Sequence, residues 1–451
     1  MTEEAQPSGI ERYFQFQPLQ TNFKTEMIAG FTTFMTMSYI LAANPAILSN
    51  AIFLEESGDL FNELAIATAI SAAIATFMMG IYARFPFALA PGMGLNAYFA
   101  FSVVLGEGIP WQMALAAVFI EGILFIILTV TNIRALVVAA IPQCLKAATT
   151  AGIGGFIAYI ALQSSGLIAN SDTTLTTLGN LASPKTGIAI IGLFLTAAFI
   201  ARRIKGGLLW GILGTAILAW IGGIAPAPTA IVGVPSLPTH LFGQAWVGLT
   251  QISLSTLGEW LTVLFVFLFV DFFDTVGTVT GLGMRTGYIQ DNGEFPGVNR
   301  ALMADAVGTV TGAMFGTSTV TSYIESASGV AEGGRSGFTA VVTGILFVLS
   351  IFFIPLLAAI PAVATAPALI IVGVLMVGTI HDIEWDDPAE AIPAFLTIIM
   401  MPLTYSIADG LAAGLIAFPL IKLFQGKTKD IPLAIWVIAA AFLLKFILEN
   451  L

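Results

Sequence analysis

The sequence has little charge for its length. Only 10% of its 451 residues are Asp, Glu, Lys or Arg, whereas 57% are hydrophobic, and the mean hydropathy is +0.94. So few polar side chains cannot cover a water-soluble particle of this size, and the composition therefore indicates a membrane protein. Apolar runs of roughly 20 residues follow one another along nearly the whole chain. They leave no room for a separate soluble domain.

Cysteine, histidine and basic residues are also scarce. The single cysteine excludes an internal disulfide and a cysteine metal cluster, and His240 and His381 are too far apart in sequence to suggest a zinc site. We therefore expect no metal and no cofactor, and no nucleophile or cofactor motif indicates an enzyme. Acidic residues outnumber basic ones by 27 to 16, and the longest basic cluster is 202–205. This charge balance makes nucleic acid an unexpected partner.

Apolar runs between polar or Pro/Gly-rich segments predict about fourteen membrane spans. With a cytoplasmic N-terminus, all 16 basic residues except Lys185 and the unplaced Lys445 face the cytoplasm, as the positive-inside rule requires. The first 25 residues lack the basic start and apolar run of a cleavable signal peptide. We expect a multi-pass protein of the cell's inner (plasma) membrane. The stretch 431–448 fits an interfacial helix or a fifteenth span, and we predict the former.

Short sequence motifs recur in the same order in the two halves of the chain. The matches are Gly122–Phe125 with Gly344–Phe347, Ala139–Pro142 with Ala358–Pro361, and Ile204–Gly211 with Ile407–Gly414. Each match joins a span to the one seven later, and because seven is odd the second copy must be inverted in the membrane. Inverted repeats are typical of secondary transporters, whose site lies near the midplane where the copies meet.

Two segments in matching positions are interrupted. Segment 86–104 contains two prolines and two closely spaced glycines, and segment 317–332 begins with a run of Thr and Ser. We predict that each is a short strand leading into a half helix whose unpaired N–H groups point toward the bilayer centre. Aligning the two segments places Asn96 near the position of Glu325.

Three carboxylates stand out, because an acid inside the membrane costs at least a few kcal/mol. Asp271 and Asp274 are three residues apart and therefore share one face of a helix. Each either binds substrate or a proton, or makes a helix–helix hydrogen bond as a protonated acid. Glu325 opens the second half helix, where it either functions or caps the helix. We favour a functional role for all three.

The other buried polar candidates have simpler interpretations. Glu121, Asp305 and Glu259 are expected to be structural partners or packing charges. Tyr323 and Tyr98 either stack on a flat ligand or belong to an ordinary aromatic core. Together the acids, half-helix amides and aromatics suit a small, planar, uncharged ligand with many donors and acceptors. A bare anion would be repelled by ionised acids.

Four motifs carry a resemblance to a known family. They are FTTFMTMSYILAANP (31–45), APGMGLNAY (90–98), DFFDTVG (271–277) and TSTVTSYIES (317–326). Together they resemble the AzgA-like guanine/hypoxanthine/adenine permeases of the nucleobase-ascorbate transporter (xanthine/uracil permease) superfamily, over about residues 10–424. The resemblance implies an all-α polytopic membrane protein with a uracil-permease-like fold, in which about fourteen spans form two inverted seven-span repeats.

The resemblance also implies a domain organisation. The expected units are a cytoplasmic N-terminal segment (1–26), the first half of a core domain (27–132, spans one to four), the first half of a gate domain (133–224), an extracellular loop (225–256), the second half of the core (257–356, spans eight to eleven), the second half of the gate (357–424) and a C-terminal tail or interfacial helix (425–451). In similar proteins the core binds substrate, and the gate supports elevator-like movement. A homodimer formed through the gate is implied as well.

Carried over residue by residue, Asp271 and Glu325 match the two acids that contact the base. Asn96 matches a polar contact of the third span, Asp274 a supporting acid, and Tyr323 the residue two before the second acid. The superfamily commonly has Glu in place of Asp271, and the shorter acid here leaves a wider pocket, consistent with a purine.

The resemblance implies import of hypoxanthine, guanine and adenine by proton symport, with Glu325 or Asp271 carrying the proton. A uracil/xanthine or anion carrier of the same fold, a channel and a membrane enzyme remain as alternatives. The residues do not exclude sodium as the coupling ion, and they do not rank the purines.

Overall fold

The computed structural model describes residues 8–131, 142–235, 237–289, 295–427 and 431–449. This part of the chain is almost entirely helical, with two small two-stranded sheets. Among the described residues, 9 helical segments are long and apolar enough to cross a membrane. The predicted fold class is therefore confirmed, whereas the number of crossings stays a prediction.

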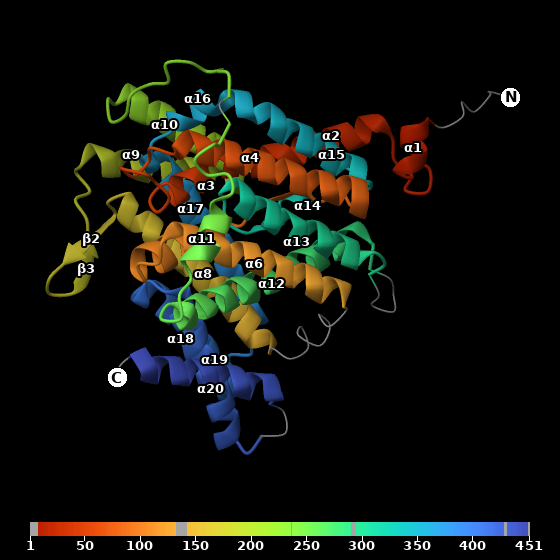
Figure 1. The fold of residues 1–451 in the computed structure, drawn as a ribbon. Coiled ribbons are helices and arrows are strands. Elements are labelled where there is room, and N and C mark those ends of the chain that lie inside the picture. Colours follow the sequence, from red (N-terminus) through yellow and green to blue (C-terminus); the bar gives the residue numbers. More distant parts are fainter. Residues whose placement is uncertain (1–7, 132–141, 236, 290–294, 428–430, 450–451) are drawn as a thin grey trace.

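The first half of the chain contains most of its short elements. In order they are α1 (Gly9–Tyr13), α2 (Phe23–Met37), α3 (Ile40–Leu48), α4 (Phe61–Phe77), the π-helical η1 (Met78–Ala83), β1 (Leu89–Pro91), α5 (Met93–Ala97), the π-helical η2 (Tyr98–Gly106), α6 (Trp111–Val130), α8 (Gln143–Ser164), β2 (Ile168–Ser171), β3 (Leu175–Leu178), α9 (Pro184–Ala201) and α10 (Gly207–Ile221). The hairpin β2–β3 stands away from the helices (Figure 1).

The second half contains the remaining elements. It consists of α11 (Gln244–Gln251), α12 (Leu257–Thr286), α13 (Val298–Phe315), β4 (Val320–Ser322), α14 (Ser326–Ala331), α15 (Gly337–Ser350), the 3-10 turn η3 (Ile351–Phe353), α16 (Ile354–Ala358), α17 (Ala362–Val377), the 3-10 turn η4 (Gly378–Asp382), α18 (Pro388–Thr404), α19 (Ile407–Phe424) and α20 (Leu433–Glu449).

The two interrupted segments meet as antiparallel strands at the centre of the molecule. Strand β1 pairs with β4 in the register Leu89 with Ser322 and Pro91 with Val320. Proline lacks an N–H and cannot continue a helix, and the β-branched residues of β4 favour extended backbone. A helix then follows each strand, α5 after β1 and α14 after β4. The predicted strands before the half helices of spans three and ten are confirmed.

The helices pack in two groups around this strand pair. Helices α2, α4, α6, α12, α13, α14 and α15 pack among themselves, while α8, α9, α10, α17, α18 and α19 form a second set of contacts. Figure 1 shows α6, α12 and α13 lying side by side in the first group. The predicted core and gate domains, with their boundaries, stay a prediction. Three features of the sequence analysis lie outside the described residues: the expected domain boundary at 132–133, the basic residue Arg134 and most of the repeated motif 139–142.

Two segments differ from a simple series of spans. The predicted extracellular loop 225–256 contains a helix, α11, which packs closely on α6: a Cβ on Gly248 would lie 1.8 Å from the Gln112 carbonyl oxygen. The C-terminal helix α20 packs on α19, and its Phe442 ring lies 5.8 Å from Phe265 of α12. Whether α20 crosses the membrane stays a prediction.

Large apolar side chains are exposed along the flanks of the molecule. Phe194 is 70% exposed, Ile221 81% and Phe424 83%. Exposing hydrocarbon side chains to water at so many positions would be unfavourable. Contact of the same side chains with lipid acyl chains carries no such cost. The exposed apolar surface therefore fits a protein surrounded by lipid.

Candidate functional site

A cavity of 890 Å³ lies beside the strand pair, between the first group of helices and α8 and α17. This volume falls within the range of about 300–1,000 Å³ that is usual for small-molecule sites. Its polar lining residues are Tyr39, Gln143, Lys146, Thr150, Asp274, Thr278, Thr280, Thr321, Ser322, Tyr323, Glu325, Thr379 and Asp382. Both halves of the sequence contribute to one cavity, as an inverted repeat requires.

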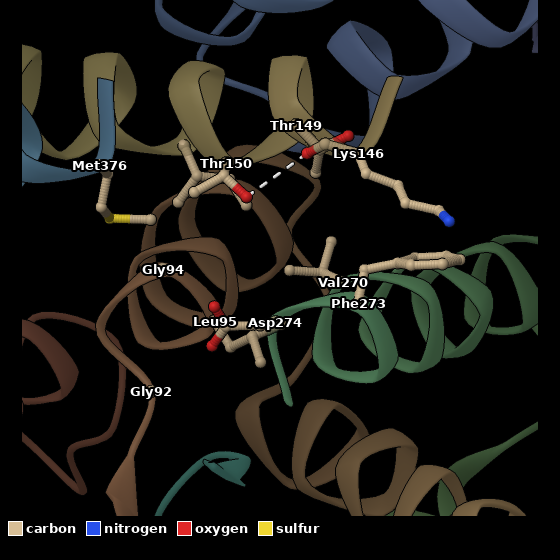
Figure 2. Close-up of a pocket in the computed structure, with 11 residues that line it drawn as sticks. Gly92, Gly94, Leu95, Lys146, Thr149, Thr150, Val270, Phe273, Asp274 and Met376 are labelled. Atoms are coloured by element: carbon tan, nitrogen blue, oxygen red, sulfur yellow. Dashed lines mark hydrogen bonds between the residues drawn. The ribbon is translucent and has the colours of Figure 1, made fainter. Parts of the chain in front are cut away.

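A recess of 30 Å³ shares several of these lining residues. Figure 2 shows Asp274 on α12 and Thr150 on α8 on opposite sides of the recess, with Gly92 and Gly94 along a third side. Glycine lets the backbone approach here, since a Cβ on Gly94 would lie 2.6 Å from a side-chain carbon of Ile153. The recess therefore lies where the first broken segment, α8 and α12 come together.

Glu325 lies at the junction between β4 and α14, at the N-cap position of the half helix. Its side chain makes no capping hydrogen bond, so it is not held by its own helix. Instead the Tyr39 hydroxyl donates to Glu325 Oε1 at 2.9 Å, and Thr36 donates to the Glu325 carbonyl at 3.4 Å. The half-buried carboxylate thus faces the cavity and retains acceptor capacity for a ligand.

The two acids of α12 occupy different environments. Asp274 is half-buried, lines the cavity and accepts a hydrogen bond of 3.4 Å from Thr321 of β4. Asp271, three residues earlier, is 0% exposed and is not among the residues that line the cavity. Asp274, which was predicted to be a supporting acid, therefore lines the cavity. Asp271, which was predicted to contact the base, lies behind the cavity wall.

Asn96 and Tyr323 hold the two broken segments together. Asn96 is fully buried in α5, and its Oδ1 accepts a hydrogen bond from Ser318, just before β4. The Tyr323 hydroxyl donates to the Pro91 carbonyl of β1. Tyr323 also lines the cavity, whereas Asn96 does not. Of the five predicted site residues, Asp274, Tyr323 and Glu325 therefore line the cavity, and the other two lie deeper.

The structure adds two residues that the sequence reasoning missed. Tyr39 lies within the quoted motif 31–45 and bonds Glu325, so its position in that motif was an available signal. Lys146 was assigned only to the cytoplasmic end of a span, yet it lines the cavity with its ammonium group 5.1 Å from the Phe273 ring centre. A lysine so close to apolar spans is unusual in a membrane protein, and this position was the signal that could have identified Lys146 as a candidate site residue.

Asp305, expected to be a packing charge, anchors the second broken segment. Its two carboxylate oxygens accept hydrogen bonds from Thr275 at 2.9 Å and from Ser322 at 3.0 Å. These bonds tie α13 to α12 and to β4, whose residues Thr321 and Ser322 line the cavity. The role observed is therefore structural support of the site.

Comparison with known families decides the classification. Residues 24–413 match the Xan_ur_permease family, described as a permease family. The chain belongs to this family. This permease is 47% identical to the guanine/hypoxanthine permease PbuG of Bacillus subtilis, over 97% of this chain and 99% of that one. It is 39% identical to the adenine permease AdeP of Escherichia coli, over 97% of this chain and 96% of that one. The resemblance drawn from the motifs is thereby confirmed.

Solved structures agree on the fold at much lower identity. The transmembrane domain of the cyanobacterial bicarbonate transporter BicA superposes with a TM-score of 0.64 at 16% identity, covering 87% of this chain and 97% of that one. The transporter SLC26A9 gives a TM-score of 0.60 at 10% identity, over 92% and 68% of the two chains. The family match and its permease relatives, together with this fold, make this permease a multi-span membrane transporter rather than an enzyme.

Proposed function

We propose that this permease imports the purine bases hypoxanthine, guanine and adenine. The observation that carries the proposal is the pair of half-buried carboxylates, Asp274 and Glu325, which come from opposite halves of the chain and line one cavity. A purine presents ring and exocyclic N–H groups, and ionised carboxylates accept such bonds in pairs. The relatives PbuG and AdeP, named for guanine, hypoxanthine and adenine, support this choice of ligand.

The proposed roles follow the positions of the five predicted residues. Asp274 and Glu325 accept hydrogen bonds from the base, and the Tyr323 ring covers part of its face. Asn96 and Asp271 act from behind the cavity wall, where Asn96 ties the two broken segments together. Two acids in the wall disfavour a bare anion, although the fold is shared with anion transporters.

We further propose that import is coupled to a proton held by Asp271 or Glu325, and that the core domain moves against the gate. The position of the cavity between the two groups of helices supports an elevator-like movement, because sliding of one group would carry the bound base with it. A plasma-membrane location with a cytoplasmic N-terminus and a homodimer formed through the gate domain belong to the same proposal.

The test is uptake of labelled hypoxanthine by cells that lack their own purine transporters. We expect accumulation that a protonophore abolishes and that unlabelled adenine or guanine blocks. Competition by uracil or sulfate alone would contradict the purine assignment and indicate that this permease is a uracil or anion carrier of the same fold. Uptake that is independent of the proton gradient would indicate a channel. Uptake that depends on sodium would show that sodium, and not the proton, is the coupling ion.

A variant series links the result to the cavity. Glu325→Gln and Asp274→Asn keep the size of each side chain and remove its charge, so we expect uptake to fall by at least about tenfold. Glu259→Gln, an exposed acid in the first turn of α12, is the matched control and should transport normally. Full uptake in either cavity variant, at normal expression, would remove that residue from the mechanism.

A further inference from the structure

A second pair of acids lies buried one helical turn behind the cavity. Glu121 of α6 and Asp271 of α12 are both 0% exposed, and the two carboxyl groups lie close enough to interact electrostatically. Glu121 is the residue expected from the sequence to be only a structural partner. The pair lies on helices that pack directly against one another.

The remaining oxygens of this pair lack donors. Thr319 donates to Glu121 Oε2 at 3.3 Å, but Glu121 Oε1 and both carboxyl oxygens of Asp271 have no hydrogen-bond partner. The Thr275 hydroxyl, one turn from Asp271, is already engaged with Asp305 and Thr321. Buried oxygens without donors are rare in folded proteins, so this arrangement indicates that one of the two acids carries a proton.

Ionised carboxylates only accept hydrogen bonds, so two of them cannot bond to each other and would repel strongly in a dry site. One proton shared between them converts the repulsion into an O–H···O bond and satisfies two of the orphaned oxygens. The other charged groups around the pair are Asp305 of α13 and Asp274 of α12 itself, while Lys146 of α8 lies at Phe273. The ion pairs found among the described residues involve other acids.

We propose that Glu121 and Asp271 share a single proton and that this pair is the proton-holding site of the transport cycle. The proposal rests on the proton symport proposed above and names where the proton resides. Glu121 then has a function beyond packing. It supplies the second carboxyl that shares the proton, so Asp271 is not left as a lone unpaired charge, which would be costly in this buried position.

The pair is connected to the cavity through α12. Asp274, which lines the cavity, is three residues from Asp271, and Thr321 links Asp274 to Thr275 through contacts of 3.4 Å and 2.9 Å. When a base docks on Asp274, hydrogen bonds from its N–H groups weaken the field that the Asp274 carboxylate exerts on the pair, and the proton held behind the cavity responds. Release breaks one carboxyl O–H bond and passes the proton through Asp274 to water in the cavity, so no other reactant is needed.

The first experiment uses the full-length protein in liposomes with an imposed pH gradient. Glu121→Gln keeps a donor for Asp271 but cannot exchange a proton, so we expect the accumulation of hypoxanthine to fall to the equilibrium level. Exchange of labelled for unlabelled base, which needs no net proton movement, should remain within a few-fold of the unsubstituted protein. Glu259→Gln is the matched control and should still accumulate the base.

The outcomes separate this inference from the proposed function. If the unsubstituted protein does not accumulate purine in a pH gradient, the proposed function fails. If it does accumulate purine and Glu121→Gln accumulates it equally well, the shared proton is overturned while the function stands. Accumulation driven by a sodium gradient alone would overturn the proton-holding site.

A spectroscopic measurement covers the case in which Glu121→Gln does not fold. Infrared spectra of the unsubstituted protein at neutral pH should contain the C=O band of a protonated carboxyl. Selective isotope labelling of aspartate should shift that band, and addition of hypoxanthine should change it. Absence of any protonated carboxyl band would overturn the proposal without recourse to a variant. Glu121→Asp, which keeps a titratable group, should restore part of the accumulation that Glu121→Gln loses.

Discussion

Tyr39 and Glu325 are joined by a hydrogen bond of 2.9 Å although they lie 286 positions apart in the sequence. The tyrosine comes from the N-cap position of α3, and the acid from the N-cap position of α14. Because the donor belongs to the first half of the chain and the acceptor to the second, this bond orients a cavity acid by contact across the repeat. It also leaves the carboxylate with acceptor capacity for a ligand.

Removing the Tyr39 hydroxyl should weaken binding of the base. Tyr39→Phe leaves the Glu325 carboxylate without its orienting donor, which costs about 1 kcal/mol, or roughly three- to tenfold in KM for hypoxanthine uptake. Tyr98→Phe is the matched control, because the buried Tyr98 hydroxyl has no hydrogen-bond partner and its loss should leave KM unchanged. Equal effects of the two substitutions would contradict the assigned role of Tyr39.

The two acids of α12 should respond differently to neutralisation. Asp274→Asn removes a proposed contact with the base, so KM should rise by about 10- to 100-fold, as expected for a hydrogen bond to a charged group. Thr278→Val, one turn further along the same wall, should change KM much less. Kinetics of labelled hypoxanthine uptake measure both. A larger effect of Thr278→Val than of Asp274→Asn would place the base elsewhere in the cavity.

Because α8 packs closely on α17, one glycine of α8 should tolerate substitution by alanine far less well than the glycine next to it. A Cβ on Gly154 would lie 2.7 Å from the Met376 Cβ and 2.8 Å from the Gly373 carbonyl oxygen, whereas a Cβ on Gly155 meets nothing within 4 Å. Gly154→Ala should therefore destabilise the protein by about 1–3 kcal/mol through overpacking. Gly155→Ala should be neutral or stabilising by up to about 1 kcal/mol, because alanine favours helix. Thermal unfolding in detergent measures both.

The loop before α18 should contribute a pH-dependent term to stability. Asp387 accepts hydrogen bonds of 2.9 Å from Gln425 Nε2 and from the Ala389 N–H, and lies 3.6 Å from Lys422 and 3.8 Å from Lys427. The bond from Gln425, then that from Ala389, lowers the pKa of Asp387 from 3.8 to about 2. A lowered pKa stabilises the fold above the ordinary value, and this contribution disappears as the pH falls through about 2.

Replacement of Asp387 by asparagine isolates this term. The unfolding midpoint of the unsubstituted protein should fall more steeply between pH 3.8 and about 2 than that of Asp387→Asn. The neighbouring Asp386, which makes none of these contacts, provides the control substitution Asp386→Asn. Identical pH profiles for all three proteins would show that Asp387 contributes nothing to the pH dependence.

Much of the architecture could be predicted from the sequence, because its causes are local. Proline, glycine and hydroxyl residues broke two segments at positions where no continuous helix can form, and both became strands followed by half helices. Apolar runs marked the spans. The helix inside 225–256 was missed because α11 is short and depends on packing against α6 rather than on its own pattern.

The site was only partly predictable for the same reason. A spacing of three residues places Asp271 and Asp274 on one helix face, but about 60° apart around the axis. Which of them faces a cavity depends on the rotation of α12, and that rotation is set by α6 and α13, far away in sequence. The bond between Tyr39 and Glu325 and the position of Lys146 over Phe273 likewise join distant segments.

The sequence by itself determined that this chain is a membrane transporter with two related halves, two broken segments and acids within its spans, because composition, periodicity and helix-breaking residues act locally. Only the tertiary structure decided that Asp274 and Glu325 line the cavity while Asp271 and Glu121 are buried behind it. The reason is geometric: the facing of a buried acid is fixed by helix packing, and no single segment contains that information.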